Sequence, residues 1–63
     1  MTEAEIQARL DEIRSLDSES AHYEEDRLHR DVLHAIAHGA EDADTLAELA
    51  LQSVDIDFTR WYA

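Results

Sequence analysis

Apolar residues in the first part of the chain repeat at helical spacing. Three of them follow one another at intervals of four and three positions: Ile6, Leu10 and Ile13. This spacing places them on one face of a helix. Ahead of them, Thr2 and Glu5 have the spacing of a capping box, in which the threonine hydroxyl accepts a hydrogen bond from a first-turn amide. The pattern predicts a first helix over residues 3–16.

A longer helical pattern follows. The apolar residues that share one side of its helical wheel are Ala21, Leu28, Val32, Ala35 and Ile36, with Leu33 at the margin. His38 followed by Gly39 is typical of a helix C-terminus, because glycine readily adopts the left-handed conformation needed there. We therefore expect a second helix over residues 19–38. The polar stretch 15–20 separates it from the first helix, since short polar side chains favour turns and N-caps.

A third pattern begins at Asp44 or Thr45, where Thr45 and Glu48 repeat the capping-box spacing. It predicts a helix over residues 44–53. The inner stripe of this helix consists of Leu46, Leu49, Ala50 and Ser53. Leu51 points away from that stripe.

The C-terminal residues carry two competing patterns. Residues 54–58 alternate between apolar and polar side chains, as an extended segment does, whereas Phe58, Trp61 and Tyr62 have helical spacing. We expect an extended lead-in and then a short helical turn over residues 57–62. Together the patterns predict an all-α protein, a single three-helix domain over residues 1–63 with a short C-terminal aromatic turn.

Length and composition exclude several classes of protein. A chain of 63 residues allows one domain at most and leaves little room for a deep enzyme cleft. It has no cysteine, so disulfides, thiolate metal sites and cysteine nucleophiles are excluded. No apolar run is longer than three residues, as in residues 49–51, which is far shorter than a membrane span, and the acidic N-terminus is the reverse of a signal peptide. We expect a cytoplasmic protein, in the host cytoplasm if it is encoded by a phage.

The charge balance indicates the kind of partner. Sixteen acidic residues and five arginines give a net charge of −11, which opposes binding to nucleic acid or to anionic membranes. A basic protein fits this field better. Solubility and salt adaptation are alternative explanations of the acidity. Because the apolar core is modest for a monomer, a homo-oligomer is also expected.

The residue types most suited to metal binding or catalysis are the four histidines, His22, His29, His34 and His38. Asp31, His34 and His38 share the outer side of the second helix at a spacing that could hold a divalent metal. The alternative, which we favour, is a solvated face, so no metal or cofactor is assigned. His29 projects toward the apolar stripe, where Glu25 at i−4 could satisfy its ring. No nucleophile motif and no lysine is present, and we therefore expect no enzymatic activity.

The C-terminal segment supplies the candidate partner-binding residues: Asp55, Asp57, Phe58, Arg60, Trp61 and Tyr62. Aromatic residues beside an arginine are the types that dominate binding hot spots. In the alternative interpretation, which we favour, the aromatic side chains fold back to complete a thin core.

Part of the chain resembles a helix-turn-helix module. The residues that carry the resemblance are 31–39 (DVLHAIAHG), 45–50 (TLAELA) and Arg60-Trp61. The resemblance implies a tri-helical second half and, as an alternative function, a DNA-binding transcriptional regulator. Asp55 and Asp57 oppose DNA binding, since they stand in the segment that would enter the groove.

The whole chain is also similar to short proteins encoded by actinobacteria and their phages. The similarity rests on residues 24–29 (EEDRLH), 31–33 (DVL), 35–37 (AIA) and 56–63 (IDFTRWYA). It implies no activity or site residues. With the charge, it leads to the expectation of a small accessory protein that acts through protein–protein interaction, by masking a basic site on a host protein.

Overall fold

The computed structural model describes residues 1–60 and confirms a small all-α domain of three helices. The elements are α1 (Glu3–Ser15), α2 (Ser18–Ala37), α3 (Ala43–Leu51) and a 3₁₀ turn, η1 (Gln52–Asp55). The helix limits predicted from the sequence differ from these by one or two residues, apart from the last turn discussed below. Residues 61–63 lie outside the described part.

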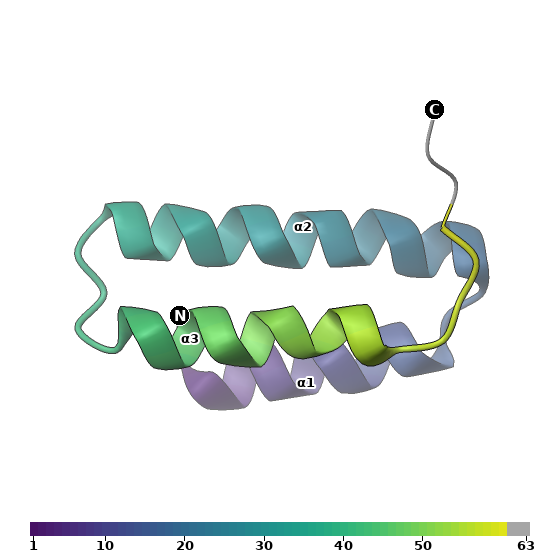
Figure 1. Ribbon diagram of the computed structural model, residues 1–63, viewed down its shortest axis with the longest axis horizontal. Helices are drawn as coiled ribbons and strands as arrows, with labels where there is room; N and C mark the ends of the chain where they lie inside the picture. Colours follow the sequence, from purple (N-terminus) through teal and green to yellow (C-terminus); the bar gives the residue numbers. More distant parts are fainter. Residues whose placement is uncertain (61–63) are drawn as a thin grey trace.

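The three helices form an up-down-up bundle. Figure 1 shows α2 running antiparallel to both α1 and α3, with a short connection at each end. Each helix packs against the other two. Within residues 1–60, none of the helices combines the length and the apolar character that crossing a bilayer requires.

Polar side chains fix where α1 and α2 begin. The amide of Glu5 donates to Thr2 Oγ1 at 3.1 Å, which confirms the predicted cap of α1. The amide of Ser20 donates to Asp17 Oδ1 at 2.9 Å, and this cap begins α2. Leu16 and Asp17 have extended backbones, so α1 and α2 are separate helices and do not form one rod.

The start of α3 differs from the prediction. The helix begins at Ala43, and its N-cap, Asp42, makes no side-chain capping bond. The capping box expected at Thr45 and Glu48 is wrong, because both residues lie inside the helix. The amide of Thr45 instead donates to Asp44 Oδ1 at 2.9 Å.

Gly39 ends α2 as predicted. Its φ is +90°, in the left-handed region. The amide of Gly39 donates to Ile36 O at 3.1 Å and the amide of Ala40 donates to Ala35 O at 3.2 Å. These two bonds define a Schellman motif, which satisfies carbonyls at the end of the helix. The motif turns the chain toward α3.

Replacing Gly39 with alanine is expected to destabilise the protein by about 1–2 kcal/mol, because a Cβ is strained at positive φ. The space around Gly39 is open, so no clash adds to this cost. Asparagine, which tolerates the left-handed region better, should cost less than alanine. Urea unfolding of both variants measures the difference. Equal stability of wild type and Gly39→Ala would contradict the assigned strain.

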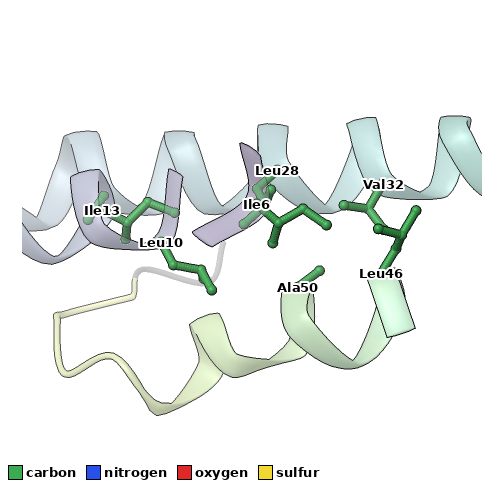
Figure 2. Packing of buried hydrophobic residues seen from close by; sticks show 8 residues of the cluster. Ile6, Leu10, Ile13, Leu28, Val32, Leu46 and Ala50 are labelled. Carbon is green, nitrogen blue, oxygen red and sulfur yellow. The ribbon is translucent and has the colours of Figure 1, made fainter. Parts of the chain in front are cut away.

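The core lies where the three helices meet. Its fully buried apolar residues are Ile6, Leu10, Ile13, Ala21, Leu28, Val32, Leu46 and Ala50. Figure 2 labels seven of them and shows the α1 side chains facing those of α2 and α3. All eight belong to the inner stripes predicted from the sequence. Leu33 and Leu51 lie outside the core, with 65% and 60% of their surfaces exposed.

The C-terminal segment reverses the predicted order of structure. Residues 54 and 55, the start of the expected extended lead-in, belong instead to the 3₁₀ turn η1, which begins with residues 52 and 53 of the predicted third helix. Residues 57–60 have no helical structure, so the helical turn predicted over 57–62 is wrong for these four residues. Trp61 and Tyr62 lie outside the described residues. The physical reason is Arg60, whose contacts with α2 and η1 hold the segment extended across the end of the bundle.

Candidate functional site

A buried ion pair closes one end of the bundle. Glu25 of α2 is only 5% exposed, and its carboxylate accepts two hydrogen bonds from the guanidinium of Arg60, each at 3.0 Å. Arg60 also donates to the carbonyls of Ser53 and Ile56, at 2.9 and 3.2 Å. The side chain of Arg60 is 18% exposed. Its guanidinium therefore links α2, η1 and the C-terminal segment through hydrogen bonds within the chain. We call this link between Arg60 and Glu25 the clamp.

His29 and Ser53 extend this polar cluster. His29 Nε2 lies 2.8 Å from Ser53 Oγ and 3.3 Å from the carbonyl oxygen of Ala50. The sequence suggested Glu25 as the partner of His29, but His29 forms its hydrogen bonds with Ala50 of α3 and Ser53 of η1 instead. A serine beside a histidine is the beginning of a nucleophile–base pair. Ser53 is completely buried, however, so a substrate cannot reach its hydroxyl in this conformation.

The clamp sets the protonation of Glu25. Burial by itself raises the pKa of this carboxyl. The hydrogen bonds from Arg60 and Ser53 and the positive charge of Arg60 outweigh burial, so the pKa of Glu25 lies below its usual value. The carboxylate is thus charged at neutral pH and fully paired with the arginine.

The lowered pKa of Glu25 predicts a specific loss of stability in acid. A carboxyl with a lowered folded-state pKa stabilises the protein above its unfolded pKa, about 4.3, and this contribution is lost as the pH falls through the folded value. Wild type should therefore exceed Glu25→Gln in stability by a constant amount from pH 7 to about pH 5, and by less below that.

Urea unfolding at several pH values measures this difference. Glu41→Gln, which removes an exposed carboxyl outside the cluster, controls for the change in net charge. A gap between wild type and Glu25→Gln that stays the same down to about pH 3 would show that the pair does not hold the charged form of Glu25.

The residues predicted to bind a partner lie in different environments in the structure. Phe58 packs against the core and its ring centre lies 3.8 Å from Arg60 Cζ. For Phe58, this agrees with the favoured interpretation that the aromatic side chains fold back. Asp55 and Asp57 are exposed, and Trp61 and Tyr62 lie outside the described residues. A partner-binding role for this set stays a prediction.

Asp31, His34 and His38, the three residues whose spacing could hold a metal, have other partners in the structure. Asp31 accepts a hydrogen bond from Arg9 of α1 at 2.8 Å, and this bond lowers the pKa of Asp31. The rings of His34 and His38 stack on each other with centres 4.3 Å apart. No group of three or more metal-ligating side chains is arranged for an ion anywhere in residues 1–60. Asp31 instead forms an ion pair with Arg9 that links α2 to α1.

An apolar groove of about 310 Å³ runs between α2 and α3. Its lining residues are His29, Val32, Leu33, Ile36, Ala47, Ala50 and Leu51. Leu33 and Leu51, the exposed leucines, form its two walls, one on each helix. In water this groove leaves apolar surface exposed that a complementary apolar face would bury.

Acidic residues flank the α3 wall of the groove. Asp44 precedes the lining residue Ala47 by three residues, and Glu48 precedes Leu51 by three, which makes each acid a neighbour of a lining residue on the surface of α3. Within residues 1–60, all five arginines lie within 4.0 Å of a carboxylate, and none of these pairs involves an acid of α3. Among the ion pairs of residues 1–60, none therefore neutralises the negative charge beside this wall.

Comparison with known proteins adds no relatives. No protein-family model matches the chain, and neither a curated protein nor a solved structure matches it. The resemblances to helix-turn-helix modules and to actinobacterial and phage proteins stay predictions. The function of the groove and of the polar cluster is therefore inferred from their own geometry and charge.

Sequence reasoning missed the groove, although a signal for it was present. In the sequence, Leu33 lies at the margin of one apolar stripe and Leu51 lies outside another. Both are large apolar side chains outside the predicted core. The sequence could not show that these two leucines face the same groove, since that depends on the rotation of each helix in the bundle. The burial of Glu25 by Arg60, 35 residues away, was missed for a similar reason.

Proposed function

We propose that this chain is a non-enzymatic protein-interaction module that binds a basic site on another protein through the groove between α2 and α3. The observation that carries the proposal is an open apolar groove on a chain whose net charge is −11. Apolar surface supplies the favourable free energy of association, and the charge selects a partner of opposite sign.

The main alternative is a helix-turn-helix protein that binds DNA. In the resemblance, the recognition helix that would enter the major groove is the segment that ends near Arg60. The described part of this segment contains only the 3₁₀ turn η1 and residues 56–60, which have no helical structure. Asp55 and Asp57, exposed in the same segment, would also face the phosphates. Both features favour a protein partner over DNA.

An affinity experiment with matched variants tests the proposal. The immobilised chain is exposed to a nuclease-treated bacterial lysate, and the retained proteins are eluted with rising salt. Leu33→Ser with Leu51→Ser removes both walls of the groove. The control, Tyr23→Ser, removes an exposed side chain of similar accessibility, 62%, that does not line the groove.

Capture of a basic protein by wild type and by the control, but not by the groove variant, is the expected result. Its release should require only moderate salt, since screening weakens attraction between exposed charges. Equal capture by the groove variant would remove the groove from the proposal. Retention of duplex DNA by the chain at low salt would favour the helix-turn-helix alternative.

A further inference from the structure

The groove residues are spaced to receive a helix. On α2 the lining positions are His29, Val32, Leu33 and Ile36, which follow the i, i+3, i+4, i+7 pattern of one helix face. On α3 they are Ala47, Ala50 and Leu51, with the same i, i+3, i+4 pattern. Two neighbouring helices present ridges with a furrow between them, and a third helix packs into such a furrow by ridges-into-grooves contacts.

Small residues let the incoming backbone come close. Ala47 and Ala50 line the groove from α3, so no bulky side chain stands between the two leucine walls on that side. The α2 lining runs over seven residue steps, which corresponds to about 10 Å or two helical turns. The groove therefore fits about two to three turns of a partner helix, a small and reversible contact.

Charge decides between the two occupants of helical form, a second copy of this chain and a foreign helix. A second copy would bring a further net charge of −11 to a wall that is already flanked by Asp44 and Glu48. Repulsion between like charges opposes that contact, since the wall acids have no cation partner within residues 1–60. A helix with lysine or arginine beside its apolar stripe would neutralise those carboxylates.

Resting on the function proposed above, we infer that the groove binds an amphipathic helix of the partner protein, with apolar residues between Leu33 and Leu51 and basic residues against Asp44 and Glu48. Binding converts the three-helix bundle locally into a four-helix arrangement. This is the helix-in-groove mode of recognition, in which i, i+3, i+4 and i+7 residues anchor the partner.

Three designed peptides of about 14 residues, four helical turns, test the inference. The first is a basic amphipathic helix with one leucine stripe. The second has the same composition in scrambled order, which removes the stripe, and the third keeps the stripe but replaces lysine with glutamate. Fluorescence anisotropy of labelled peptides gives Kd for wild type, for Leu33→Ser with Leu51→Ser, and for Asp44→Asn with Glu48→Gln.

The basic amphipathic peptide should bind wild type at least about tenfold more tightly than either of the other peptides. Each double variant should lose about tenfold of that affinity. Equal binding of the scrambled peptide would overturn the helix inference, because charge alone would then suffice. Equal binding of the acidic peptide would overturn the role of Asp44 and Glu48.

Two further outcomes separate this inference from the proposed function. If the lysate experiment yields a groove-dependent basic protein but no peptide binds, the partner is not a helix, and the inference fails while the proposed function stands. If sedimentation shows a wild-type dimer that Leu33→Ser with Leu51→Ser dissociates, a second copy occupies the groove and the inference is overturned.

Discussion

Replacing Leu28 with alanine is expected to unfold a large fraction of the protein. Leu28 is fully buried among side chains of all three helices, and a leucine-to-alanine change at such a site costs about 2–5 kcal/mol. A domain of 63 residues has a total stability of only about 3–9 kcal/mol. Chemical denaturation followed by circular dichroism at low temperature measures the loss.

Leu33→Ala is the matched control, since the same change is made on the same helix. Leu33 is 65% exposed, so its truncation removes little buried surface and should change the free energy of unfolding by less than about 1 kcal/mol. The two variants together test the assignment of core and groove. Similar losses for Leu28→Ala and Leu33→Ala would mean that the groove is packed inside the protein and not open to a partner.

Breaking the Glu25–Arg60 pair should have an effect of comparable size. Removing one partner of a buried pair leaves the other charge without compensation, which costs about 3–5 kcal/mol. Arg60→Ala also removes the donor to the carbonyls of Ser53 and Ile56. We therefore expect Arg60→Ala to be at least as destabilising as Glu25→Ala. Urea unfolding at pH 7 compares them, with an osmolyte added if either variant is unfolded in water.

The double variant distinguishes a true pair from two separate contributions. Once Arg60 is absent, removing Glu25 should cost little or even restore stability, since no buried charge is left alone. The loss in Glu25→Ala with Arg60→Ala should thus be clearly smaller than the sum of the two single losses. Additive losses would contradict the clamp. Arg27→Ala with Glu24→Ala, an exposed pair on α2, is the control and should cost less than about 1 kcal/mol.

Local signals in the sequence determined most of the fold. The apolar spacing in each helix identified every fully buried apolar residue, because a bundle buries the one stripe that each helix offers. Thr2 and Gly39 marked helix ends correctly, since capping depends on residues within one turn of the cap. The start of α3 was misplaced, because nothing local separates a cap at Asp42 from one at Asp44 or Thr45.

The tertiary structure alone decided the polar clamp and the groove. The sequence suggested His29 as the partner of Glu25 and counted Arg60 among the candidate partner-binding residues. Only the packing of η1 and the C-terminal segment against α2 brings Glu25 and Arg60 to 3.0 Å. Leu33 and Leu51 read as unrelated residues beside two stripes, and only the packing of α2 against α3 makes them the walls of one groove. Helical periodicity fixes which face of a helix is buried, whereas contacts between distant segments depend on how those faces meet.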